Sequence, residues 1–417
     1  MNRPGRLAVA VVSMAMAGNL QYAWTMCVQP LVSERHWTLS ETQWGFTVFI
    51  AAMTWTMPLC GAAIDRFGVR ALMAAAAFLC AAGWSLLGYA ATLPHFYFFY
   101  AVAGVGSALV YCCCTAFGLR LFPDKRGMAS GLIVAGYGSG AAVFNPLFGC
   151  MILAVGCRLT FLFTGVVLGV AILIAGRLLG ELPPAQPAAA PASGSESPNS
   201  DEFGPRAMLR TPRFYTLFLM MMAMGVGGLM TTAQIAPIAR EFHIGPAALA
   251  ISLALNPLAN GLSRIMWGWI SDRLGRRLTM CVAFSLNAIF LASVALLGAK
   301  GDVWFVITTA LVFLTWGELY ALFPAALADN FGVRHASANY GLLYLSKSVA
   351  SILSGGLAAH FFEGTGSWSY AFYVSAALAL CSGLAALRLG PMALPSTPAQ
   401  VIPVGIRTSG QADPLAP

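Results

Sequence analysis

The sequence is poor in charge, and this scarcity excludes an ordinary soluble domain. Only 9% of the 417 residues are Asp, Glu, Lys or Arg, whereas about a quarter is usual for soluble proteins. Hydrophobic residues make up 59% of the chain. With so few charges, the chain cannot cover a surface that faces water on all sides.

Residues that hold metals or perform acid–base chemistry are also scarce. The five histidines fall near the ends of apolar runs, and the ten cysteines include no C-x-x-C pair. Nearly all cysteines lie within apolar runs, so we interpret them as small packing residues. Paired carboxylates and a glycine-rich nucleotide loop are lacking as well. We therefore expect no metal, no cofactor and no enzymatic activity.

What the chain has instead is a series of apolar runs of the length that crosses a membrane core of about 30 Å. The first run continues to Leu31, well past any signal-peptidase site, so we expect it to be retained as a span. The runs predict an all-α membrane protein embedded in lipid. We count twelve of them: 8–31, 41–63, 71–90, 94–121, 127–154, 158–181, 213–240, 246–270, 277–299, 302–327, 336–361 and 368–390.

Lysine and arginine gather in every second loop of this arrangement. Seventeen lie on the side of the N-terminus, and four lie on the other side. Basic loops stay in the cytoplasm, so we expect a protein of the bacterial cytoplasmic membrane with both termini inside. The net charge of +8 is then a topology signal, and we expect no nucleic-acid partner.

Two similar halves flank a segment of different composition. Residues 182–212 are rich in Pro, Ala, Ser and Gly, which predicts a cytoplasmic linker. We expect six-helix halves at 1–181 and 213–390, followed by a disordered tail at 391–417. Such repeated halves are typical of transporters whose binding site lies between them.

A short loop motif occurs once in each half. "GAAIDRFGVR" occupies 61–70 and "GWISDRLGRR" occupies 268–277, with their aspartates 207 residues apart. The doubled motif resembles the signature of the major facilitator superfamily, and the resemblance covers essentially the whole chain. It implies the major facilitator fold, close helix approach at Gly61 and Gly268, and a gating role for four loop residues: Asp65, Arg66, Asp272 and Arg273.

Three ionisable residues lie deep inside expected spans: Arg264, Glu318 and Lys347. Charge inside a membrane is costly and usually functional. Arg264 follows Asn256 and Asn260 at spacings of four, which predicts one polar stripe on a helix. Lys347 shares a face with Tyr340, Tyr344 and Ser351. Two cations with at most one acid nearby favour an anionic substrate that bridges the two stripes.

Several stretches add aromatic side chains to this pocket and resemble the oxalate:formate antiporter family. They are "QYAWT", "FPDKRGMASG" followed by "AGYG", "LRTPRFY", "TWG" with "YALFP", and "NYG" six residues before the lysine. The resemblance implies that Arg264 and Lys347 bind the carboxylate groups of the substrate. It further implies pocket walls from aromatic residues, with Gln21 and Asn260 as weaker candidates: Tyr22, Tyr111, Tyr137, Trp316, Tyr320 and Tyr344.

Glu318 departs from that family, which has a small residue at this position. On an ideal helix it points about 160° away from the face shared by Trp316 and Tyr320. Two roles remain open, namely pairing with a cation between helices and uptake of a proton. This difference leaves open which carboxylate is transported and whether protons are coupled to it.

The leading interpretation is secondary transport of small carboxylates by alternating access, as oxalate/formate-type exchange by a monomer. The alternative is a proton-coupled symporter of monocarboxylates such as lactate or formate. An anion channel or a transporter-like sensor also fits the composition. Saturable counterflow distinguishes a carrier from a channel, and ligand binding without transport identifies a sensor.

Overall fold

The computed structural model describes residues 2–122, 126–181, 203–332 and 335–389. These residues form helices and contain no strand. The first half of the chain contains α1 (Arg3–Tyr22), α2 (Trp24–Arg35), α3 (Leu39–Leu87), α4 (Leu93–Leu121), α5 (Arg126–Ser139) and α6 (Ala141–Leu179). The rest contains α7 (Pro205–Met208), α8 (Pro212–Glu241), α9 (Pro246–Leu274), α10 (Arg276–Leu297), η1 (Gly298–Lys300), α11 (Asp302–Leu314), α12 (Leu319–Phe331), α13 (Ala336–Tyr344), α14 (Ser346–Ser354), α15 (Gly356–Thr365) and α16 (Ser369–Ala386).

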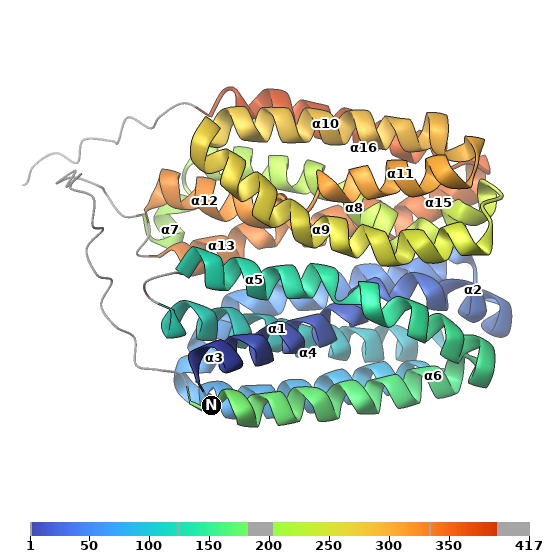
Figure 1. The fold of residues 1–417 in the computed structure, drawn as a ribbon, viewed down its shortest axis with the longest axis horizontal. Coiled ribbons are helices and arrows are strands. Elements are labelled where there is room, and N and C mark those ends of the chain that lie inside the picture. The colour runs from blue at the N-terminus through green and yellow to red at the C-terminus, as the bar shows by residue number, and fades with distance from the viewer. Residues whose placement is uncertain (1, 123–125, 182–202, 333–334, 390–417) are drawn as a thin grey trace, which may run out of the picture.

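The long helices form two bundles that lie side by side (Figure 1). Helices α1 to α6 make up the blue and green bundle, and α8 to α16 make up the yellow and red one. Large apolar side chains cover the outer surfaces, as at Phe78, Leu153 and Val303, which are 72%, 89% and 68% exposed. Hydrocarbon solvates such a surface and water does not. The structure thus confirms the expected all-α membrane fold.

Two of the longest helices change direction at a glycine. α3 and α6 contain Gly68 with φ 75° and Gly156 with φ 79°. Residues with a Cβ rarely adopt this left-handed region, so glycine permits both bends. Each of these helices therefore contributes two rods. With α1 continuing into α2 and α5 into α6, the first bundle has the six rods that the sequence predicts.

Membrane-spanning character is evident along most of the described chain. Nine stretches are long and apolar enough to cross a bilayer, and several of them contain more than one helix. In the second bundle α11 continues into α12, and α13 continues through α14 into α15. Together with α8, α9, α10 and α16 these give six further rods, which match the apolar runs expected from the sequence.

Hydrogen bonds join the two bundles at the end remote from the linker. Gln43 of α3 donates to Ala233 O at 2.9 Å and to Gln234 Oε1 at 2.8 Å in α8. Thr47 Oγ1 donates to Ser351 O at 2.9 Å. The backbone N–H of Ser40 donates to Glu363 Oε1 at 2.8 Å. We refer to these cross-bundle contacts of α3, α8, α14 and α15 as the seam.

The expected linker and tail lie mostly outside the described residues, which lack 182–202 and 390–417. The end of the linker segment is described and is ordered against the second bundle. Phe203 donates its N–H to Phe331 O at 3.1 Å, and Asn339 Nδ2 donates to Phe203 O at 2.9 Å. α7 follows directly and also contacts α13.

One expectation about the loop motif is wrong. Among the described residues, a Cβ added at Gly268 would meet no atom within 4 Å, so no close helix approach is found at this glycine in the conformation described. The surroundings of Gly61 and the side chain of Asp65 lie outside the described part of the structure. The corresponding expectations for the first copy of the motif therefore stay predictions.

Candidate functional site

Interrupted helices surround the centre of the molecule. α1 and α2 are separated at Ala23, α5 and α6 at Gly140, α13 and α14 at Leu345, and α11 and α12 by the turn Thr315–Glu318. Interruptions deep in a membrane protein are tolerated where the backbone is buried in protein or lines a cavity. In transporters they often form the substrate site. Most of the predicted pocket residues lie within three positions of one of these breaks.

Lys347 lies two residues beyond the break at Leu345 and is only 4% exposed. Its Nζ donates to Gln21 Oε1 at 3.0 Å and to the Tyr344 hydroxyl at 3.4 Å. The ammonium is also 5.7 Å from the ring centroid of Tyr320. Its neighbours are therefore neutral oxygen atoms and aromatic faces, and no ion pair of Lys347 occurs among the described residues.

Arg264 lies on α9, is 6% exposed, and contacts the other bundle. Its guanidinium donates to Asn260 Oδ1 through Nη2 at 3.0 Å and through Nε at 3.3 Å. Nη1 donates to the carbonyl oxygen of Val134 in α5 at 2.7 Å. The guanidinium carbon is 4.5 Å from the ring centroid of Tyr320. Within the part of the chain that is described, it too makes no ion pair.

The two cations thus face the same aromatic ring. From their distances to the Tyr320 centroid, the guanidinium carbon of Arg264 and Nζ of Lys347 are at most about 10 Å apart. Both are buried between the bundles and bonded to uncharged groups. Like charges so placed repel each other in a medium of low dielectric constant. The arrangement is therefore unfavourable when empty and suited to an anion.

The six aromatic residues predicted as pocket walls form one continuous series of ring contacts that crosses from the first bundle to the second. Aromatic pairs at these separations are favourable and hold their rings in defined orientations. The centroid distances are 6.2 Å for Tyr22–Tyr137, 5.5 Å for Tyr137–Tyr111, 6.2 Å for Tyr111–Tyr344, 6.0 Å for Tyr344–Tyr320 and 5.8 Å for Tyr320–Trp316.

Gln21 connects this series to Lys347. Its Oε1 accepts from Lys347 and from the Tyr137 hydroxyl, the latter at 3.3 Å, and its side chain is 0% exposed. Nε2 of Gln21 is buried and has no hydrogen-bond partner among the residues that the structure describes. An unpaired buried amide donor costs about 1–3 kcal/mol. That donor is available to an oxygen atom of a bound ligand.

Two glycines bring the backbone close to Asn260. A Cβ at Gly317 would lie 2.3 Å from the carbonyl oxygen of Asn260, and a Cβ at Gly138 would lie 2.6 Å from Asn260 Oδ1. A side chain at Gly317 would push the α9 backbone away, and one at Gly138 would displace the Asn260 side chain. The turn before α12 and the end of α5 therefore clamp the residue that orients Arg264.

Glu318 is in this same turn, and no ring contact or ion pair joins it to the aromatic series or the two cations among the described residues. It is 0% exposed, and its Oε2 accepts from the Ser263 hydroxyl at 3.2 Å. Oε1 is buried and accepts no hydrogen bond from the described part of the chain. Of the two roles left open for Glu318, pairing with a cation is not found in the described structure.

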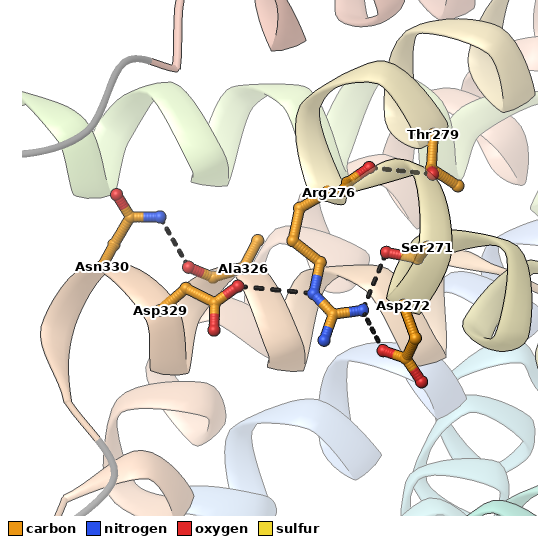
Figure 2. Close-up of polar contacts among 8 residues, drawn as sticks. Ser271, Asp272, Arg276, Thr279, Ala326, Asp329 and Asn330 are labelled. Atoms are coloured by element: carbon orange, nitrogen blue, oxygen red, sulfur yellow. Dashed lines mark hydrogen bonds and ion pairs between the residues drawn. The ribbon is translucent and has the colours of Figure 1, made fainter. Parts of the chain in front are cut away.

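The second copy of the loop motif builds a charged cluster at the linker end of the molecule (Figure 2). Arg276 donates to Asp272 Oδ1 and to the Ser271 hydroxyl, both at 2.8 Å, and its Nε lies 3.3 Å from Asp329 Oδ2. It thereby ties the loop after α9 to the end of α12. Arg273 instead stacks on Trp269, with its guanidinium carbon 3.7 Å from the ring centroid.

In the first copy, Arg66 has a simpler environment than its counterpart cluster in the second copy. Arg66 is exposed and lies over the neighbouring ring of Phe67, at 5.2 Å. Arg66 and Arg273 therefore resemble each other, since each stacks on an aromatic residue of its own helix end. The gating role expected of these residues stays a prediction.

Comparison with known proteins identifies the family. A family model described as Major Facilitator Superfamily matches residues 7–235 and again residues 216–405. The chain belongs to the major facilitator superfamily.

Similarity to individual relatives indicates where the chain belongs within the superfamily. The chain is 34% identical over 375 residues to the oxalate:formate antiporter of Oxalobacter formigenes, across 90% of this chain and 88% of that protein. It is 22% identical over 333 residues to the uncharacterized MFS-type transporter YhjX of Escherichia coli, across 79% and 81%. With monocarboxylate transporter 13 of Bos taurus it shares 24% over 345 residues, across 82% and 78%. The protein is thus a transporter of the oxalate:formate antiporter family, and not an enzyme.

The sequence did not reveal the role of some residues that the structure places at or near the site. Ser263, the partner of Glu318, follows the stripe residue Asn260 by only three positions, but serine alone gives little signal. Arg276 was visible within the motif, and its role depends on the distant Asp329. Asn256, noted in the stripe, has both amide atoms buried without partners. It was left out of the predicted pocket.

Proposed function

We propose that this transporter exchanges small carboxylate anions across the membrane by alternating access. The observation that carries the proposal is the pair of buried cations, Arg264 and Lys347, which both lie near the Tyr320 ring and have only neutral partners among the described residues. Burying an unpaired charge costs several kcal/mol. A carboxylate that bridges them relieves this cost and their mutual repulsion.

The pocket also selects the shape of the anion. Arg264 offers a planar fork suited to one carboxylate group, and Lys347 offers a compact charge for a second. The rings of Tyr111, Tyr320 and Tyr344 restrict the space between Arg264 and Lys347. Small dicarboxylates such as oxalate fit a site with two positive charges, in keeping with the name of the Oxalobacter formigenes relative.

Exchange follows from the same electrostatics. A ligand favours whichever conformation it binds more tightly, and an anion neutralises the cations most fully when the bundles close around it. An empty carrier must close with the two positive charges unscreened, so return without substrate is slow. Obligatory exchange of one anion for another is the result.

Proton-coupled transport of a monocarboxylate is the second candidate, and the environment of Glu318 favours it. A neutral, protonated Glu318 fits its burial without a cation, and one proton moving with a monoanion is a common coupling scheme. The distant similarity to monocarboxylate transporters, at 24% identity, is compatible with this candidate. For either candidate we propose that the basic, linker end faces the cytoplasm.

Counterflow in proteoliposomes tests the proposal. Liposomes loaded with unlabelled oxalate should accumulate external labelled oxalate transiently, and liposomes without internal anion should not. Parallel assays with formate and lactate identify the preferred class. A channel would give uptake that is independent of internal anion. Absence of trans-stimulation by every carboxylate tested would overturn the exchange mechanism.

A further inference from the structure

Glu318 lies at a position where an ionised carboxylate is unsupported. It is fully buried, its one hydrogen bond to another side chain comes from the Ser263 hydroxyl at 3.2 Å, and Oε1 has no partner. No Lys, Arg or His of the described residues lies within ion-pair distance of its oxygens. The exchange mechanism proposed above makes no use of this group.

The ionisable groups on the elements packed around it do not supply a counter-charge. On α9 the nearest is Arg264, whose guanidinium is bonded to Asn260 and Val134 and stacked on Tyr320. α8 has no ionisable side chain between Tyr215 and Arg240. The remaining groups lie at the ends of the elements or carry no positive charge: Asp272 and Arg273 of α9, Arg276, Arg277 and Cys281 of α10, Asp302 of α11, Tyr320 and Asp329 of α12, and Tyr340 and Tyr344 of α13.

An isolated carboxylate in such a place becomes neutral by binding a proton. Transferring an unpaired charge into a protein interior is far more costly than transferring the neutral acid, so buried groups of this kind change their protonation state. The Ser263 hydroxyl can donate to one carboxyl oxygen, and the proton occupies the other. A protonated Glu318 is thus the form that fits the conformation described.

The position of Glu318 connects it to the part of the molecule that must move. The turn Thr315–Glu318 interrupts the rod formed by α11 and α12, and Gly317 lies directly against the Asn260 carbonyl of α9. The next ring along, Tyr320, contacts both cations. Displacement of α9 or of the turn as the pocket opens would separate Ser263 from Glu318 and admit water to the carboxyl group.

We propose that Glu318 is a proton-binding site, protonated when the pocket is closed and able to release its proton to water when the pocket opens. This inference rests on the proposed function, because it links the proton to the same opening and closing. The proton comes from water on the side to which the pocket is open and returns to water, and no covalent bond to substrate changes. Anion movement therefore becomes dependent on pH through a group that does not touch the anion.

Infrared spectroscopy tests the protonation state without requiring transport. In the full-length protein near pH 7, the spectrum should contain the carbonyl stretching band of a buried carboxylic acid, and Glu318→Gln should remove it. Ser263→Ala should move the band, because the hydrogen bond to the carboxyl group is lost. The matched control is Glu34→Gln, which alters an exposed side chain on α2 and should leave the band in place. A band that persists in Glu318→Gln would overturn the proposal.

Transport measurements test the coupling. Labelled oxalate counterflow should be measured between about pH 6 and 9, where oxalate is fully ionised. If closure requires one proton, the wild-type rate should fall by up to about tenfold per pH unit above the transition. Glu318→Gln should flatten this profile, and Glu34→Gln should retain it. A flat wild-type profile, or an unchanged profile in Glu318→Gln, refutes coupling while exchange itself stands. Failure of wild-type counterflow with every carboxylate would instead refute the proposed function.

Discussion

The ammonium group of Lys347 donates a hydrogen bond of 3.0 Å to the side-chain oxygen of Gln21, which joins the second bundle to the first at the centre of the molecule. Gln21 is neutral, so it satisfies the geometry of the ammonium group without cancelling its charge. The same oxygen also accepts from Tyr137. Gln21 therefore occupies the place that an anionic oxygen would take with greater gain in energy.

Replacing this neutral partner with a charged one should block the site. Gln21→Glu places a carboxylate against Lys347, and a hydrogen bond between charged groups contributes about 1.5–3 kcal/mol. We expect anion affinity to fall by roughly ten- to a hundredfold and the melting temperature of the ligand-free protein to rise. Equilibrium binding and thermal unfolding of purified protein measure both effects.

A matched control exists for this change. Gln29 lies on α2 and accepts a hydrogen bond from Arg240, so Gln29→Glu creates a similar carboxylate–cation pair away from the pocket. It should leave anion affinity within about twofold of the wild-type value. Equal losses in the two variants would show that Gln21 has no special relation to the site.

Removing either cation should abolish transport while the protein stays folded. Lys347→Gln and Arg264→Gln each halve the positive charge of the pocket, and truncating one partner of a buried charged contact costs about 2–5 kcal/mol. Counterflow should fall by more than about thirtyfold. Arg158→Gln is the control, since Arg158 stacks on Tyr89 at 4.1 Å, outside the pocket. Near-normal uptake by either pocket variant would remove that residue from the site.

Replacing Lys347 with arginine tests whether the shape of the cation matters as well as its charge. Lys347 is 4% exposed and packed against Tyr320 and Tyr344. A guanidinium group is larger and planar, so Lys347→Arg should displace these rings and reduce transport although the charge is kept. The expected result is a fall in counterflow of at least about tenfold. Wild-type rates would show that charge alone is recognised.

The sequence was sufficient for much of the pocket because membrane spans make unusual residues conspicuous. Arg264, Lys347 and Glu318 are the deep charges of an otherwise apolar chain, and an α-helical spacing of four places Asn260 beside Arg264, where the structure has it. Single aromatic residues were less informative, since packing and binding residues look alike. Their continuous series of contacts depends on tertiary structure.

Interruptions in the helices could not be predicted from the periodicity of the sequence. The sequence-based geometry treated 316–320 and 340–351 as regular helices, whereas the structure has a turn at Thr315–Glu318 and a break at Leu345. The conclusion that Glu318 faces away from Trp316 and Tyr320 depended on a regular helix, so it stays a prediction, and the observed contact of Glu318 is its bond to Ser263. The contact of Lys347 with Gln21, 326 positions away, could not be inferred from local periodicity.

The cluster around Arg276 should control conformational exchange and leave anion affinity largely unchanged. Asp272→Asn weakens the pair with Arg276, which connects the loop after α9 to Asp329 of α12. A loss of about 1 kcal/mol in one conformation alters a rate by roughly fivefold. We expect the counterflow rate of Asp272→Asn to change by about this factor, in either direction. The dissociation constant for the anion should stay within about twofold of the wild-type value.

The control for this change is an exposed ion pair at the other bundle. Glu181 lies 3.6 Å from Arg70, and both side chains are mostly exposed. Such pairs contribute little to stability, so Glu181→Gln should not alter turnover. A large loss of affinity in Asp272→Asn with unchanged turnover would contradict a gating role.

Substitution of Gln43 should open the seam between the two bundles. This side chain accepts from Trp24 Nε1 at 3.0 Å and donates to Ala233 and Gln234, all of them buried. Gln43→Leu removes three hydrogen bonds and leaves their partners unsatisfied, at about 2 kcal/mol or more. The equilibrium between the conformation with a closed seam and the one with an open seam should therefore shift roughly thirtyfold toward the open one.

Hydrogen–deuterium exchange detects that shift without added labels. Peptides that contain Ser40, Thr47 and Ser351 should exchange faster in Gln43→Leu than in the wild type. The Ser40 amide is bonded across the seam, and the Thr47 hydroxyl and the Ser351 carbonyl hold the two helices together there, so opening admits water to all three segments. Asn287→Leu is the matched control. Asn287 is equally buried and donates to Val312 O at 3.1 Å, but its bonds lie within the second bundle. This variant should lower the melting temperature and leave exchange at the seam unchanged. Unaltered protection of the seam in Gln43→Leu would mean that packing of the apolar side chains, and not these hydrogen bonds, holds that end closed.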